Sequence, residues 1–169
     1  MTAGSTYRLS RETVHYVWDN SIPPLLMIES GDTVIFETRE SSDGRYSKQS
    51  RVGPRPDLLT NPPPPAKGHP LTGPVLIRDA QPGDTLEIQV LDLIHGDWGY
   101  TAFRPGAGLL GAEFPIPYVH IWDLSRDPAP LRPGVAVPLE PFLGVMGVAL
   151  AEPGEFSTIP PGATAATWT

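Results

Sequence analysis

Residues 30–37 read SGDTVIFE, and residues 82–89 read PGDTLEIQ. Each stretch places a Gly-Asp turn before a run of β-branched and apolar residues, a pattern typical of a turn that leads into a β-strand. The two stretches form a weak internal repeat, which turn chemistry alone explains. They predict strands over residues 32–38 and 85–94.

The predicted strand at residues 85–94 has the clearest pattern of the chain. Leu86, Ile88 and Val90 alternate with polar residues. Successive side chains of a strand point to opposite faces, so this alternation places the three apolar residues toward a core. Asp92 interrupts that face.

Further strand patterns recur between turn signals. We predict strands over residues 13–18, 75–78, 98–103, 118–123, 135–139 and 142–150. The chain contains 22 Pro and 17 Gly among 169 residues. Their combined share is well above the roughly 12% that Pro and Gly together reach in ordinary proteins. Long helices are therefore not expected, because an interior Pro removes a backbone hydrogen bond. The predicted fold class is all-β and β-sandwich-like.

Composition excludes several classes of function. The net charge is −7, and the 12 Lys and Arg residues are scattered, whereas a nucleic-acid partner requires a basic stripe and a membrane surface a basic amphipathic helix. We therefore expect no nucleic-acid partner and no membrane. The absence of Cys excludes thiolate metal ligands and a thiol nucleophile. The N-terminus lacks a signal-peptide pattern, so a cytoplasmic location is expected.

Residues 39–74 form the main irregular stretch and include the run NPPPP at 61–65. A structureless segment of that length inside a compact domain is usually either functional or disordered. The Pro run favours a stiff polyproline II conformation. We interpret the stretch as a lid or active-site loop.

Four titratable residues near strand ends and loops are candidates for chemistry: Glu37, His69, Asp97 and His120. Glu37 is the best of them, because a carboxylate at the end of an apolar strand is costly to bury without a metal or a cation. Each of the other three also has a structural interpretation. Asp97 could cap a hairpin turn, His69 could be a surface residue, and His120 could be a hydrogen-bonded core histidine.

An oxygen and nitrogen metal site built from Glu37, Asp97 and a His would suit a divalent ion that activates water. Spacing alone supports this only weakly. No nucleophile elbow, phosphate-binding glycine loop or HExxH motif is present.

Seven motifs occur in an order that resembles the N-terminal half of the acetamidase/formamidase family. They are GDTVIFETR (31–39), HPLTGPV (69–75), PGDTLE (82–87), GDWG (96–99), IWDL (121–124), PFLGVMGVA (141–149) and EPGE (152–155). Together they cover nearly all of residues 1–161.

The resemblance implies a β-rich domain over residues 1–161, a cytoplasmic homo-oligomer, and hydrolysis of short linear amides to ammonia and a carboxylate. It also implies a divalent metal, with Zn²⁺ or Ca²⁺ suspected. By motif position, Glu37, Asp97 and Thr72 are the catalytic candidates, and Glu37, His69 and Asp97 the metal-ligand candidates. Amide hydrolysis needs an activated water and stabilisation of an oxyanion.

The chain departs from the family pattern at residues 162–169, which read GATAATWT. Family members typically continue there as RRHGGNMD, through a second half. The codons CGG CGC CAC GGC GGC AAC ATG GAC encode that octet, and loss of their first base gives GATAATWT. We therefore hypothesise that residues 162–169 are an out-of-frame reading, with the alternative of a genuine short tail.

Loss of a second half has a physical consequence, because it leaves sheet edges and apolar faces uncovered. Residues 142–150, FLGVMGVAL, are almost continuously apolar and predict a strand buried on both faces. We expect the 169-residue chain to be impaired as a catalyst.

A non-catalytic β-sandwich module that binds a carbohydrate or another small molecule is the alternative. Trp18, Trp98 and Trp122 could form its aromatic platform. The position of Trp122 in an apolar strand favours the core instead.

The tail hypothesis predicts the nucleotide sequence beyond the stop codon. A neighbouring reading frame should encode Gly-Gly-Asn-Met-Asp followed by a second β-rich half. Sequencing of the coding DNA in all three frames tests this, and the hypothesis fails when no frame encodes such a half.

Overall fold

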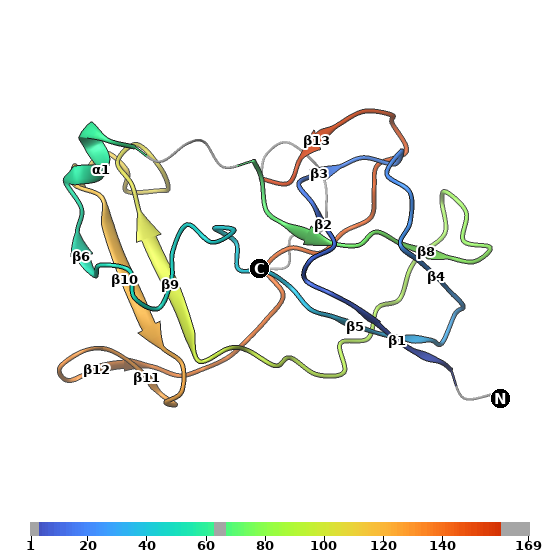
Figure 1. Cartoon of the computed structure of the whole chain (residues 1–169), viewed down its shortest axis with the longest axis horizontal. Helices are drawn as coiled ribbons and strands as arrows, with labels where there is room; N and C mark the ends of the chain where they lie inside the picture. The colour runs from blue at the N-terminus through green and yellow to red at the C-terminus, as the bar shows by residue number, and fades with distance from the viewer. Residues whose placement is uncertain (1–3, 63–66, 160–169) are drawn as a thin grey trace. The chain divides into compact units, whose positions relative to one another are not determined.

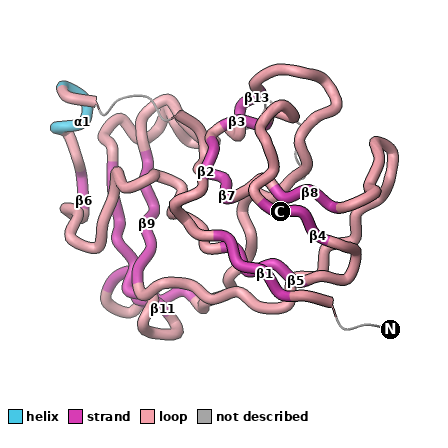
Figure 2. Tube along the Cα trace, turned by 45° about the vertical axis from the view of Figure 1, so that its right-hand side comes forward, coloured by secondary structure: helices cyan, strands magenta, loops and turns pink. Residues whose placement is uncertain are grey.

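The fold is known from a computed structural model, which describes residues 4–62 and 67–159. Apart from one helical turn, every regular element in these residues is a β-strand, which confirms the all-β prediction. Figure 2 shows these short strands set in a chain that is mostly loop and turn. The elements are β1 (Thr6–Leu9), β2 (Val14–His15), β3 (Val17–Trp18), β4 (Leu26–Ile28), β5 (Thr33–Phe36), β6 (Gly53–Pro54), α1 (Asp57–Thr60), β7 (Leu71–Thr72), β8 (Val75–Ile77), β9 (Trp98–Phe103), β10 (Tyr118–Asp123), β11 (Ala129–Arg132), β12 (Val135–Val137) and β13 (Phe156–Ser157).

The chain divides into two compact units. Unit 1 consists of the described parts of Met1–Asp43, Ala66–Gln89 and Leu143–Thr169, and unit 2 of the described parts of Gly44–Pro65 and Val90–Phe142. The single domain predicted over residues 1–161 stays a prediction. The predicted aberrant tail at 162–169 lies outside the described residues.

Unit 1 is built from pairs of short strands. β1 and β5 run parallel, as do β4 and β8, whereas β2 pairs antiparallel with β7 and β3 with β13. Figure 1 shows β1 beside β5, although more than twenty residues separate them in sequence. Leu9 at the end of β1 and Trp18 at the end of β3 belong to the buried hydrophobic core.

Unit 2 contains a three-stranded sheet in the order β6–β10–β9 and the hairpin β11–β12. β9 and β10 form the longest regular pairing of the described residues, antiparallel from Tyr118 opposite Phe103 to Asp123 opposite Trp98. Val119 of β10, which pairs with Gly53 of β6 on one side and Ala102 of β9 on the other, is almost completely buried.

Most predicted strands are present in shortened form. The segment 13–18 becomes β2 and β3, interrupted at Tyr16, and the segments 32–38, 75–78 and 135–139 become β5, β8 and β12. β9 and β10 match the predicted 98–103 and 118–123. The irregular stretch 39–74 carries β6, α1 and β7. Its Pro run at 61–65 lies largely outside the described residues.

Two strand predictions are wrong for the described residues. Residues 85–94 and 142–150 pair with no described strand and form none. The predicted core face of the first segment is instead exposed, by 38% at Leu86, 55% at Ile88 and 50% at Val90. A β-strand is defined by backbone bonds to a neighbour, so an alternating sequence without a partner does not form one.

Residues 142–150 are not buried on both faces, in contrast to the prediction. Phe142 is 74% exposed and Val148 61%. Across the described residues the buried hydrophobic core consists of Leu9, Trp18, Val119 and Ala129, whereas 23 large apolar or aromatic residues are exposed. The described chain therefore buries a small core for its size.

None of the helices in residues 4–62 and 67–159 has the length and apolar character needed to cross a membrane.

Gly68 is a position where unit 1 requires a glycine. Its φ is +133°, and an added Cβ would lie 2.5 Å from the carbonyl oxygen of Tyr16 and 2.6 Å from the Thr158 hydroxyl. Gly31, in the same unit, has a φ of +92° and open space around its Cβ position.

We expect Gly68→Ala to lower the free energy of unfolding by about 3 kcal/mol, because backbone strain and atomic overlap add. Gly31→Ala should cost about 1 kcal/mol from strain alone. Urea denaturation followed by tryptophan fluorescence measures both, since buried Trp18 lies in unit 1. Equal losses for the two variants would contradict the close approach at Gly68.

Candidate functional site

Glu37 directly follows β5, and the pairing of β5 with β1 supplies its counter-charge. Arg8 of β1 donates from Nε to Glu37 Oε1 over 2.8 Å. This hydrogen bond is the main cause that lowers the pKa of the Glu37 carboxyl from its ordinary value of 4.5. The cation that the sequence required beside this strand-end carboxylate is therefore Arg8.

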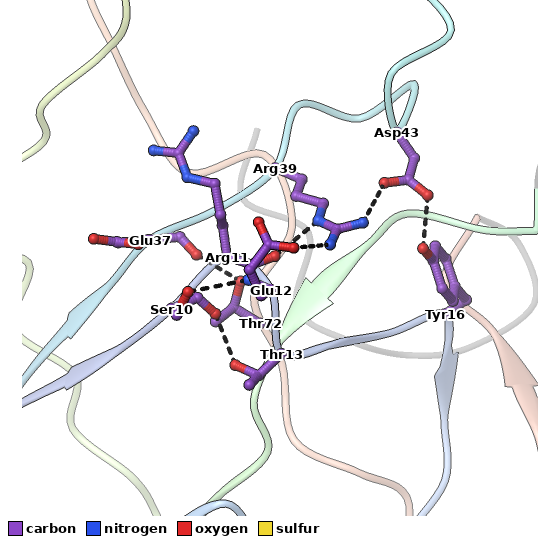
Figure 3. A network of polar contacts seen from close by, with 9 residues as sticks. All are labelled: Ser10, Arg11, Glu12, Thr13, Tyr16, Glu37, Arg39, Asp43 and Thr72. Atoms are coloured by element: carbon purple, nitrogen blue, oxygen red, sulfur yellow. Dashed lines mark hydrogen bonds and ion pairs between the residues drawn. The ribbon is translucent and has the colours of Figure 1, made fainter.

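Thr72 contacts the backbone of Glu37. Its hydroxyl donates to the carbonyl oxygen of Glu37 over 2.8 Å. Thr72 belongs to β7, which β2 holds by antiparallel pairing. The structure thus brings two of the predicted catalytic residues together, as Figure 3 shows.

His69 lies three residues before Thr72 in unit 1. Its backbone N–H donates to the Thr158 hydroxyl over 2.6 Å, and Thr158 is only 3% exposed. This bond fixes the start of the HPLTGP motif against the segment around β13. His69 as a whole residue is half-buried.

Asp97 belongs to unit 2 and is an exposed residue just before β9. Its Oδ2 accepts an ion-paired hydrogen bond of 2.7 Å from Lys48 Nζ, which raises the pKa of that lysine. The Asp97 carbonyl oxygen also accepts from the backbone N–H of Leu124 over 3.0 Å. This bond extends the β9–β10 ladder at its open end, away from the connection through residues 104–117. Asp97 therefore pairs beside a strand, which differs from the turn cap of its structural interpretation.

His120 lies on β10 beside Trp122, with 4.5 Å between the ring centroids. Its Nε2 is the only buried side-chain nitrogen or oxygen without a hydrogen-bond partner among the described residues. The structural interpretation of His120 as a hydrogen-bonded core histidine holds for the packing of its ring against Trp122. It does not hold for the hydrogen bond, which Nε2 lacks among the described residues.

A charged network next to Thr72 was not predicted, although the sequence contains its parts. Arg39 ends the GDTVIFETR motif and donates to Asp43 Oδ1 over 3.1 Å, to Glu12 Oε2 over 3.0 Å and to the Arg11 carbonyl oxygen over 2.8 Å. The side chains of this network face one another in Figure 3. A single Arg thereby connects the start of β2 with the loop that follows β5.

Tyr16 completes the network by donating its hydroxyl to Asp43 Oδ2 over 2.6 Å. This hydrogen bond is the first cause that lowers the pKa of Asp43, and it raises the pKa of Tyr16; Arg39 also lowers the pKa of Asp43. Lys67 Nζ lies 5.4 Å from the centroid of the Tyr16 ring, in cation–π range. The sequence gives no signal for Tyr16, because residues 13–18 predict one uninterrupted strand and the break at Tyr16 is visible only in the structure.

The residues described here do not fit the predicted metal site. Residues 4–62 and 67–159 contain no group of three His, Asp or Glu side chains able to hold a metal ion. The Glu37 carboxylate is instead bound to Arg8, and the Asp97 carboxylate to Lys48. The divalent ion stays a prediction.

The Asp43 bonds predict a pH-dependent contribution to stability. A carboxyl whose pKa is lower in the folded state stabilises the fold above its ordinary pKa of 3.8, and this contribution is lost as pH falls through the folded-state value. We expect Asp43→Asn to lower the free energy of unfolding by about 1–2 kcal/mol at pH 7, with a smaller difference near pH 2.

Urea denaturation of wild type and Asp43→Asn between about pH 2 and pH 7 measures this difference. Tyr16→Phe is the matched variant, because it removes one donor and leaves the carboxyl with Arg39. It should show a smaller loss with the same sign. A difference between wild type and Asp43→Asn that does not change with pH would contradict the assignment.

Comparison with known proteins identifies the family. The sequence profile of the Acetamidase/Formamidase family matches residues 4–154. The chain is 28% identical to an acetamidase of Mycolicibacterium smegmatis, over 91% of this chain and 38% of that protein. It is 26% identical to a formamidase of Methylophilus methylotrophus, over 92% of this chain and 36% of that protein.

Solved structures agree with this match. The crystal structure of an acetamidase from Bacillus halodurans superposes with a TM-score of 0.74 and 31% identity, over 86% of this chain and 47% of that one. A predicted acetamidase/formamidase from Thermoanaerobacter tengcongensis shares the fold with a TM-score of 0.77 at 23% identity. The chain thus spans less than half the length of these relatives. It belongs to the acetamidase/formamidase family.

Proposed function

We propose that this chain forms the N-terminal part of an enzyme that hydrolyses the carbon–nitrogen bond of short linear amides to ammonia and a carboxylate. The family match over residues 4–154 is the observation that carries this proposal. Its relatives bear the names acetamidase and formamidase, which indicate acetamide and formamide as the substrate class.

Glu37 and Thr72 are the proposed centre of the reaction, because the Thr72 hydroxyl contacts the Glu37 backbone. The Arg8 bond lowers the pKa of Glu37, so this side chain is a carboxylate throughout the neutral range. A carboxylate accepts hydrogen bonds, which suits it to orient a water molecule or the N–H groups of an amide. A carboxylate carries no proton, so Glu37 in this form is not suited to act as a general acid.

Asp97 and His69 enter the proposal through their family motifs. His69 shares unit 1 with Glu37 and Thr72, and the bond from its backbone to buried Thr158 holds it in place. Asp97 carries a carboxylate bound to Lys48. Assistance by a divalent metal and a homo-oligomeric, cytoplasmic state belong to the same proposal.

We further propose that the 169-residue chain alone turns over little or no amide. The described residues hold no cluster of three metal-ligating side chains, and their apolar segments at 85–94 and 142–150 are uncovered. A site for hydrolysis requires groups fixed close to the reacting atoms, and exposed segments without strand pairing do not provide that rigidity.

The alternative of a carbohydrate-binding module lacks a supporting observation. Its aromatic platform required Trp18, Trp98 and Trp122 on one exposed face, but Trp18 is buried. Trp122 is half-buried and donates its indole N–H to the Thr101 hydroxyl over 2.9 Å.

The test of the proposed function is a chimera that joins residues 1–159 to the part of the Mycolicibacterium smegmatis acetamidase that follows the matched region. We expect this chimera to release ammonia from formamide or acetamide. Glu37→Gln should lower kcat/KM by about 100-fold or more, because it removes the charge that orients the reacting groups.

Glu29→Gln is the matched control, since Glu29 is also a carboxylate ion-paired with an arginine, Arg78, of unit 1. It should leave kcat/KM within about twofold of the unsubstituted chimera. A chimera that is folded by circular dichroism and releases no ammonia overturns the proposed activity. Formamide hydrolysis by the purified 169-residue chain overturns the proposed impairment.

A further inference from the structure

The two Gly-Asp turns of the repeat are built in the same way. At the first turn, the backbone N–H of Asp32 donates to the Glu29 carbonyl oxygen over 3.1 Å, and Asp32 Oδ2 accepts from the Glu29 backbone N–H over 2.8 Å. At the second, Asp84 and Gln81 make the same two bonds, at 3.0 Å and 2.8 Å. The glycine of each turn has a positive φ, +92° and +101°.

The segments that follow the two turns differ in pairing. After the first turn, β5 pairs in parallel with β1, and the backbone N–H groups of Thr33 and Glu37 donate to the carbonyl oxygens of Ser5 and Leu9 over 2.9 Å each. Asp32 Oδ1 also accepts the Ser5 backbone N–H over 2.7 Å. The turn thus binds the beginning of its partner strand.

After the second turn, none of these bonds has a counterpart among the described residues. Within residues 4–62 and 67–159, residues 85–96 make no backbone–backbone bond, and Asp84 Oδ1 accepts no hydrogen bond. Residues 85–94 nonetheless carry five exposed large apolar residues, with Ile94 at 91%. A row of unpaired backbone groups beside exposed apolar side chains is a template for an added strand.

We propose that residues 85–94 are a docking strand for polypeptide equivalent to the remainder of the longer family members. The repeat supplies the geometry: the incoming strand runs parallel to residues 85–89, and a backbone N–H at its start donates to Asp84 Oδ1. The bound strand accepts from the backbone N–H groups of Thr85 and Gln89, the counterparts of Thr33 and Glu37. This proposal concerns assembly and does not depend on the proposed activity.

The choice of partner follows from length. The chain superposes on the Bacillus halodurans acetamidase at a TM-score of 0.74 while covering 47% of it. More than half of that relative therefore lies outside the superposed region, and it is available to pair with a segment such as residues 85–94 that has no partner strand among the described residues.

Charge disfavours a second copy of this chain as the partner. Residues 85–94 contain Glu87 and Asp92 and no basic residue, and the chain carries a net charge of −7. Pairing two identical segments would bring like charges near one another, which destabilises a strand pair. The partner strand should be apolar on one face, with neutral or basic residues near these two carboxylates.

Coexpression tests the proposal. The untagged 169-residue chain is produced together with a tagged polypeptide made of the Mycolicibacterium smegmatis acetamidase beyond the matched region. We expect the two to copurify as a one-to-one complex, and the amides of Thr85 and Gln89 to exchange hydrogen at least about tenfold more slowly in the complex than in the chain alone.

Gln89→Pro should raise the dissociation constant of the complex at least about tenfold, because it removes a pairing N–H. Gln89→Ala is the matched control, since it alters the same side chain and keeps that N–H. Its dissociation constant should stay within about twofold of wild type.

Three outcomes overturn the proposal: no copurification, copurification without slower exchange at residues 85–94, or slowed exchange there by self-association of the chain alone. Binding and exchange are read without an amidase assay. A complex that forms as expected and releases no ammonia therefore counts against the proposed function and leaves the docking strand supported.

Discussion

The pairing of β1 with β5 is the interaction on which the candidate site depends. A strand satisfies its backbone polar groups only through a neighbour, so β5 exists because Thr6–Leu9 lies beside it. The same pairing brings Arg8 within hydrogen-bond distance of Glu37, at 2.8 Å. Glu37 in turn offers its carbonyl oxygen to Thr72 of β7. The chemistry of the strand end is thus a consequence of backbone pairing between segments distant in sequence.

Paired charges are the second constraint on this protein. The net charge of −7 leaves few cations for its acidic groups, yet the carboxylates that matter at the candidate positions each have one. Arg8 binds Glu37, Lys48 binds Asp97 and Arg39 binds Asp43. Such pairs contribute little stability where they are exposed. Their effect on chemistry is larger, because a carboxylate bound to a cation is a poorer base and is less available to a metal ion.

The sequence predicts well what is decided locally. Turn residues and alternation located β9 and β10 to the residue, because a hairpin partner lies close in the chain. The same signals failed at residues 85–94, where pairing depends on a strand that the described residues do not supply. β1 was missed because it pairs with β5, which follows more than twenty residues later in the chain. The contact between Glu37 and Thr72 and the network around Arg39 could not be predicted, since both depend on pairing and registers between distant segments.

The repeat separates these local and non-local contributions within one chain. Both Gly-Asp turns form with the same bonds whether or not a partner strand is present, so the turn is encoded locally. The position that follows the strand differs: it is Glu37 in the first copy and Gln89 in the second, 52 residues later. A carboxylate there is favourable where β1 brings Arg8 beside it. A neutral amide needs no such cation, so the second copy places no demand for an arginine on the strand that lies beside it. The acidic group of the candidate site is therefore tied to the copy whose partner strand supplies its counter-charge.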